Sequence, residues 1–321
     1  MAAAEAVAAG TTWHHGDMTY DEFGLFHENI AEYDLPVSAH PTVRRVEVPS
    51  TDPGRNVSAL VWGDGPAELV LVHGGAQNAH TWDTVALDLG IALVAVDLPG
   101  HGHSDWRDDG AYTPSNLADD VAEVVRAHAP AARAVVGMSL GGLTSLELTH
   151  QHPGLVPQLV LVDITPGVNQ AKAKAVIDFV NGPQSFPSFD DLLARTIEHN
   201  PTRSESSLRR GILHNAHQRA DGEWEWNYDR RSHARSRDEL AEAGQATPSG
   251  YSPLWDHLGA LRCPLTVLRG SVSPVVDDDD IAEVLRRQPE ARVEVVEGAG
   301  HSIQGDRPRE LAELLRGVIR R

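Results

Sequence analysis

The chain has 321 residues, 41% hydrophobic and 23% charged, which is too much apolar material for a disordered protein and enough for a large core. Its 27 Lys and Arg residues stand against 46 Asp and Glu residues, and this net charge of −19, with no long basic cluster, argues against nucleic acid as a partner. The one cysteine, Cys263, excludes an intrachain disulfide, and no apolar run approaches the roughly 20 residues that span a bilayer, so we expect a cytoplasmic protein with no membrane partner.

Residues 1–41 form an N-terminal extension with weak periodicity. The first ten residues lack the basic start and continuous apolar stretch of a secretory signal, which agrees with a cytoplasmic location. The extension carries several aromatic residues, which predict that it packs on the body of the protein: Trp13, Tyr20, Phe23, Phe26 and Tyr33.

From Thr42 onward, short apolar runs alternate with amphipathic stretches. The stretches 114–128, 141–151 and 308–320 have helical periodicity. Strands alternating with helices favour an α/β protein with a mostly parallel sheet. Only a turn-rich segment separates the first two runs, which therefore predict an antiparallel hairpin at the sheet edge. The runs predicted as strands are 43–48, 57–62, 68–72, 91–96, 133–137, 158–162, 264–269 and 292–297.

The alternation stops over residues 167–250, between two predicted strands. This segment predicts helices at 170–180, 188–199 and 204–218, and we interpret it as a mainly helical insertion rather than a second domain with its own sheet. The core would then comprise 42–166 and 251–321.

Alternating aromatic residues, Trp224, Trp226 and Tyr228, stand within this insertion and share one face if the segment is extended. They could line a substrate pocket or pack the insertion onto the core. We favour packing.

The segment Gly137-Met138-Ser139-Leu140-Gly141 fits G-x-S-x-G, between a predicted strand and a predicted helix. Small residues are needed where a strand turns sharply into a helix and lifts a serine hydroxyl clear of the sheet. The N–H groups at the helix start favour a developing oxyanion. We therefore predict Ser139 as a nucleophile. Met138 could border a pocket or fill space in the core.

A second glycine-rich segment, His73-Gly74-Gly75, directly follows a strand. We predict that the N–H groups of Gly75 and Leu140 form an oxyanion hole, because glycine permits close backbone approach. In the loop 94–105, Asp97 is expected to accept backbone N–H bonds rather than take part in catalysis.

His301 follows the last predicted strand on a glycine-rich loop. A serine nucleophile needs an imidazole base near its hydroxyl, and imidazole titrates close to neutral pH. Its place between the final strand and the terminal helix makes His301 the candidate base.

These four segments together resemble the α/β-hydrolase superfamily, from about residue 43 to the C-terminus. The resemblance implies a serine hydrolase with a Ser–acid–His triad, the insertion as a lid over the serine, and no metal or organic cofactor. In most relatives an Asp follows the glycine that ends the penultimate strand, but here Ser273 stands there.

Two acids could replace the missing one. Asp163 in the segment Asp163-Ile164-Thr165-Pro166 follows the strand after the nucleophile helix, which resembles an esterase subgroup with its acid at that place. Asp277 is the alternative, although an Asp run at a helix start usually serves the helix dipole. We favour Asp163.

The leading interpretation is a serine hydrolase that cleaves a small-molecule carboxylic ester through an acyl-enzyme. A lactonase, a thioesterase, a C–C bond hydrolase or a cofactor-free perhydrolase could use the same triad. A ligand receptor with slow or absent turnover is an alternative of another class. No pattern indicates the oligomeric state.

Overall fold

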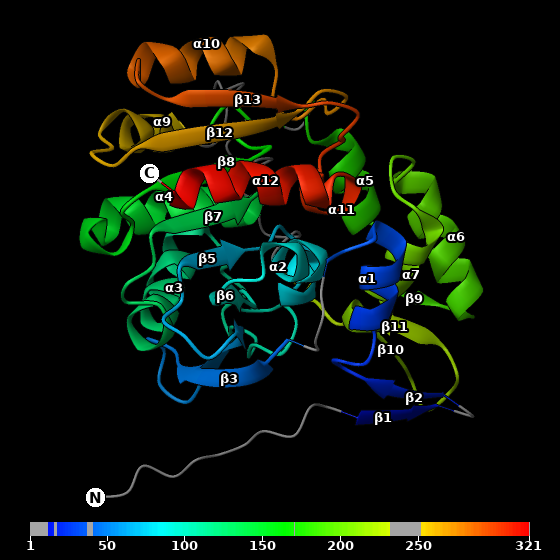
Figure 1. Cartoon of the computed structure of the whole chain (residues 1–321). Helices are drawn as coiled ribbons and strands as arrows, with labels where there is room; N and C mark the ends of the chain where they lie inside the picture. Colours follow the sequence, from blue (N-terminus) through cyan, green and yellow to red (C-terminus); the bar gives the residue numbers. More distant parts are fainter. Residues whose placement is uncertain (1–11, 16–17, 37–40, 170, 232–251, 321) are drawn as a thin grey trace, which may run out of the picture.

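An eight-stranded sheet forms the centre of the molecule. The computed structural model describes residues 12–15, 18–36, 41–169, 171–231 and 252–320. The strand order is β13-β12-β8-β7-β5-β6-β4-β3 (Figure 1). All eight predicted strands form, with bounds β3 Val43–Pro49, β4 Asn56–Trp62, β5 Leu69–Val72, β6 Leu93–Val96, β7 Ala134–Met138, β8 Leu159–Val162, β12 Leu265–Gly270 and β13 Arg292–Val296.

Strand direction follows the prediction. β3 and β4 pair antiparallel at one edge of the sheet, and β4 also pairs antiparallel with β6. The remaining pairs, from β6 through β5, β7, β8 and β12 to β13, are parallel. The carboxyl ends of these parallel strands therefore meet at one edge, where ligands bind in open α/β sheets.

Helices cover both faces of the sheet. One layer contains α2 (Asp83–Leu89) and α12 (Pro308–Ile319), and the opposite layer contains α3 (Pro114–His128), α4 (Leu140–Gln151), α9 (Ser252–Gly259) and α10 (Asp278–Arg287). The predicted helices 114–128, 141–151 and 308–320 thus form with bounds within one residue of the prediction.

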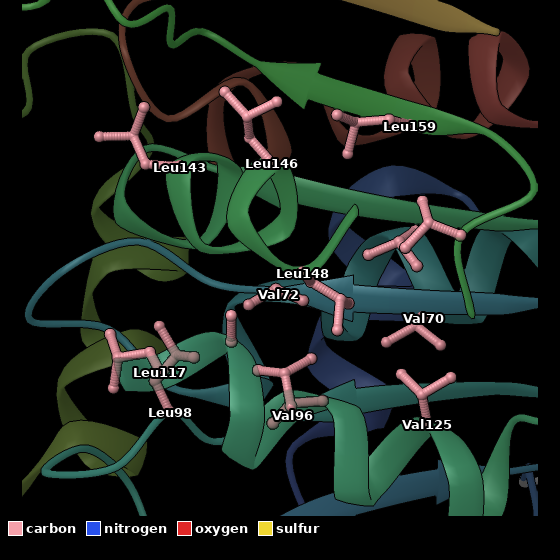
Figure 2. Packing of buried hydrophobic residues seen from close by; sticks show 14 of the residues in the cluster. Val70, Val72, Val96, Leu98, Leu117, Val125, Leu143, Leu146, Leu148 and Leu159 are labelled. Atoms are coloured by element: carbon pink, nitrogen blue, oxygen red, sulfur yellow. The ribbon is translucent and has the colours of Figure 1, made fainter. Parts of the chain in front are cut away.

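The core is divided by the sheet into two apolar clusters. Along β5, Val70 and Val72 enter the cluster beneath α3 and α4, whereas Leu69 and Leu71 enter the cluster beneath α2 and α12. Figure 2 shows Val70 and Val72 facing leucines and valines of the neighbouring helices. Because both faces are covered, these strands are continuous apolar runs rather than alternating ones.

The insertion lies between β8 and β12 and contains both helices and strands. It comprises α5 (Lys174–Val180), β9 (Ser185–Phe186), α6 (Phe189–His199), α7 (Glu205–Asn215), β10 (Ala216–Gln218) and β11 (Trp224–Trp226). β10, β11 and β9 form an antiparallel sheet. The insertion is mainly helical, as predicted, but it also contains this small sheet, which the sequence pattern does not predict, and the predicted helix 204–218 ends at Asn215. Strands of two or three residues are too short to produce a period-2 pattern. Residues 232–250 lie outside the described residues.

The described part of the N-terminal extension packs against both the core and the insertion. It contains β1 (Thr12–His15), β2 (Met18–Asp21) and α1 (Phe26–Tyr33). The Phe26 ring lies 5.0 Å from that of Trp62 in β4, and Glu28 forms a 3.1 Å ion pair with Arg209 of α7. Residues 1–11, 16–17 and 37–40, and the Trp13 side chain, lie outside the described residues.

Among the residues that the structure describes, no helix combines the length and apolar character that crossing a bilayer requires.

Candidate active site

Ser139 lies in a sharp turn between β7 and α4. Its backbone has φ 52° and ψ −121°, a conformation that a non-glycine residue adopts at a cost and that concentrates at functional sites. Glycine is required beside it, because a Cβ on Gly137 would lie 2.3 Å from the Gly141 carbonyl oxygen. A Cβ on Gly141 would lie 2.3 Å from the Val72 carbonyl oxygen. The G-x-S-x-G spacing therefore reflects the close approach of β7, α4 and β5.

Asp163 and His301 come together at the carboxyl edge of the sheet. Asp163 follows β8, is fully buried, and accepts a hydrogen bond from His301 Nδ1 at 2.8 Å through Oδ2. The Gly270 N–H donates to Oδ1 at 2.9 Å, and the Ser273 hydroxyl donates to Oδ2 at 2.5 Å. Three donors thus fix the position of the carboxylate. Ser273 stands where most relatives carry the triad Asp, and here its hydroxyl holds Asp163, the acid that takes over that role. The sequence pattern does not predict this contact.

Asp277 has other partners. It caps α10, where its side chain accepts the Asp280 N–H at 3.0 Å, and it forms a 2.8 Å ion pair with Lys172. Of the two candidate acids, only Asp163 contacts His301 in the described part of the chain.

The glycine-rich segment after β5 passes directly over Ser139. A Cβ on Gly74 would lie 3.1 Å from the Ser139 Cβ and 2.5 Å from the Met138 sulfur. Leu140 is the first residue of α4, so its N–H has no intrahelical acceptor. The Gly75 N–H has no acceptor among the described residues. The oxyanion role of the Gly75 and Leu140 N–H groups stays a prediction.

Two buried histidines hold this segment against the next loop. His73 Nε2 accepts the Leu98 N–H at 2.9 Å, and His101 Nε2 accepts the Ala76 N–H at 3.0 Å. Because each Nε2 accepts, the ring proton must reside on Nδ1, which lies beside a backbone carbonyl in both residues. Burial lowers the pKa of both histidines, that of His101 to about 3.

Asp97 performs the structural role predicted for it. Its carboxylate accepts the Ala79 N–H at 2.7 Å and the His103 N–H at 3.1 Å, and it forms a 2.7 Å ion pair with Arg45. The glycine-rich segment after β5 is thus fixed at both ends.

The low pKa of His101 predicts a specific pH dependence of stability. In the unfolded chain a histidine titrates near pH 6.5, so below that pH the unfolded state binds a proton that the folded state excludes. The free energy of unfolding should therefore fall as the pH decreases from about 6.5 toward about 3. His101→Gln keeps an acceptor for the Ala76 N–H but cannot titrate, so its stability should fall less over this range. Urea denaturation at several pH values measures the free energy of unfolding of the wild-type protein and of His101→Gln. If the two free energies fell in parallel with pH, His101 would not be the source of the pH dependence.

A cavity of about 120 Å³ lies between the core and the insertion. Gln77, Ser302, Phe179 and Trp226 contribute to its wall, so it adjoins both the oxyanion segment and the His301 loop. Trp226 is 7% exposed and fits the predictions of both packing and pocket lining.

Two other predicted pocket residues are not among those that line this cavity. Met138 is 1% exposed and belongs to the core cluster beneath α2 and α12. Trp224 packs edge-on against Phe189, with 5.0 Å between ring centroids. The contacts of both residues fit the packing alternative, and their role in a substrate pocket stays a prediction.

The fold and these contacts agree with a match to a known family. The model of the alpha/beta hydrolase family matches residues 69–314, which is most of the chain. The chain belongs to this family. The resemblance drawn from four short motifs is thereby confirmed, as is the predicted fold.

Individual members of the family give closer comparisons. The chain is 43% identical over 306 residues to esterase Rv0045c of Mycobacterium tuberculosis, covering 93% of this chain and 96% of that protein. The crystal structure of this esterase superposes with a TM-score of 0.79, covering 94% of this chain and 99% of that one. The 3-hydroxybutyrate-oligomer hydrolase of Cupriavidus necator is 28% identical over 280 residues, which is 83% of this chain and 94% of that protein.

Proposed function

We propose that this family member is a serine hydrolase of carboxylic esters, with Ser139, His301 and Asp163 as its catalytic triad. The hydrogen bond between His301 Nδ1 and the buried Asp163 carboxylate carries the proposal, because it leaves Nε2 free to act as a base. The 43% identity to an esterase supports esters as the substrate class.

Acylation uses only groups of this chain. Ser139 Oγ attacks the ester carbonyl carbon while His301 Nε2 takes the hydroxyl proton. The oxyanion of the tetrahedral intermediate accepts hydrogen bonds from the N–H groups of Gly75 and Leu140. His301 then gives its proton to the leaving alkoxide, and an alcohol departs from acyl-Ser139.

Deacylation repeats these steps with water. His301 takes a proton from water as the oxygen attacks the acyl carbon, and it returns that proton to Ser139 Oγ as the carboxylic acid leaves. Asp163 stabilises the imidazolium in both half-reactions and keeps the ring proton on Nδ1.

The insertion at 167–250 acts in this proposal as the lid. Its aromatic residues Phe179 and Trp226 border the cavity between insertion and core, whose wall includes Gln77 and Ser302 but neither Ser139 nor His301. We also infer a cytoplasmic location, supported by the single cysteine, and no nucleic-acid partner, supported by the net charge of −19.

A series of p-nitrophenyl esters tests the proposal against the receptor alternative. We expect repeated turnover with a linear acyl chain of preferred length, because the lid encloses the acyl group. A single burst of p-nitrophenol followed by no further release would indicate a receptor-like protein that is acylated but does not hydrolyse. Parallel assays with thioesters and lactones of matched acyl length separate the other hydrolase activities.

A further inference from the structure

Three buried side chains, none of them a member of the triad, meet at the contact between core and insertion. His80 belongs to the short helix η1 (Ala79–Trp82), Asp83 begins α2, and His214 lies in the last turn of α7. One donor atom from each lies within 4.8 Å of the others, and all three residues are at most 7% exposed. The mechanism above uses none of them.

Polar atoms of this cluster lack protein partners. His214 Nε2 and Asp83 Oδ1 are buried with no hydrogen-bond partner among the described residues. His214 Nε2 lies 3.7 Å from Asp83 Oδ2, and His80 Nδ1 lies 2.9 Å from the same oxygen. Buried polar atoms without partners are costly, so a ligand that binds both His214 Nε2 and the Asp83 carboxylate would be favourable here.

The other ring nitrogen of each histidine already has a partner. His80 Nε2 lies 3.0 Å from the Glu22 carboxylate, and His214 Nδ1 lies 2.6 Å from the Tyr20 hydroxyl. Metal-bound imidazoles usually direct their remaining nitrogen to such a carboxylate or hydrogen-bonding group, which sets the tautomer and the ring orientation. The N-terminal extension thus supplies both outer partners.

Several buried carboxylates gather around the cluster. Glu22, Asp83 and Asp97 are each at most 3% exposed, and the Arg45 guanidinium pairs with Glu22 and Asp97. A cation bound between Asp83 and the two histidines would face this group of carboxylates.

We propose that His80, Asp83 and His214 form a buried binding site for a transition-metal dication such as Zn²⁺. Two imidazole nitrogens and one carboxylate oxygen are common ligands for this ion. The adjoining cavity, whose wall includes all three residues, has room for a water molecule as fourth ligand. The ion would join α7 of the insertion to η1 and α2 of the core.

Binding requires a local adjustment. The His80 and His214 rings are stacked, with 3.9 Å between centroids and 7° between planes, so both must tilt to direct their nitrogens at one ion. The ion replaces the proton shared between His80 Nδ1 and Asp83. Metal binding to such a site releases protons and adds its binding free energy to folding.

Titration of the full-length, untagged and chelator-treated protein tests this proposal. We expect isothermal titration calorimetry to show a tight Zn²⁺ site, and Co²⁺ to give the intense visible absorption of a four-coordinate ion. His214→Ala should remove this site, so the number of tight Zn²⁺ ions falls by one. Tyr20→Phe should weaken Zn²⁺ binding by about 10–100-fold, the usual effect of losing an outer partner. Both readouts are independent of ester hydrolysis.

A second stacked histidine pair provides the matched control. The ring centroids of His150 and His257 lie 3.6 Å apart with 8° between the ring planes, and His257 Nδ1 lies 2.7 Å from Glu147 Oε1. These residues sit on α4 and α9 in the opposite layer, and they do not converge within the described part of the chain. His150→Ala should leave the titration unchanged. Absence of tight Zn²⁺ binding by the wild-type protein, or undiminished binding by a folded His214→Ala, would overturn the proposal.

Discussion

Ser139→Ala should abolish covalent labelling by a fluorophosphonate probe and lower kcat for ester hydrolysis by roughly 10⁴–10⁶-fold. The structural reason is that Ser139 is held by a strained turn at φ 52° between β7 and α4, where the family motif places its nucleophile. No acyl-enzyme can form without its hydroxyl. Residual activity would come from binding and the oxyanion donors alone.

Ser145→Ala is the matched control for this experiment. Ser145 lies in α4, which follows Ser139; it is buried, and its hydroxyl donates to the Gly141 carbonyl at 2.7 Å. Its loss should leave labelling intact and cost only about 1 kcal/mol of stability. Full labelling of Ser139→Ala, shown by mass spectrometry of the intact protein, would rule out Ser139 as the nucleophile.

Asp163→Asn should lower kcat by about 10³–10⁴-fold with little change in fold. Both carboxylate oxygens accept N–H donors, Oδ1 from Gly270 and Oδ2 from His301. An asparagine must therefore place its NH₂ group against one of them. If it faces His301, it donates to Nδ1 and moves the ring proton to Nε2, where the imidazole can no longer act as a base.

Asp277→Asn is the paired control. Asparagine still caps α10, so the substitution should cost about 0.3–1 kcal/mol in stability and leave kcat nearly unchanged. The comparison uses kcat together with thermal unfolding of both variants. Near-normal turnover in Asp163→Asn beside an inactive Asp277→Asn would reverse the assignment of the acid.

Features that depend on local pattern could be predicted from the sequence. All eight sheet strands were predictable because a parallel sheet buried on both faces requires continuous apolar runs. The turn at Ser139 was predictable because only glycine fits at positions 137 and 141, where backbones approach closely. The brief strands β9 and β10 were not predictable, because they contain too few residues to show a period, and only the alternation of Trp224, Trp226 and Tyr228 indicated an extended segment at β11.

The tertiary structure alone decided which distant side chains meet. Two acids, Asp163 and Asp277, were compatible with the sequence, and strand order separates them: β8 pairs with β12, which brings Asp163 beside Gly270 and Ser273. The same holds for His80, Asp83 and His214, which belong to the core and to an insertion far along the chain. The local pattern of a segment predicts which of its faces is buried. Which side chains of distant segments meet depends on how those faces pack together, and the pattern of one segment cannot predict that.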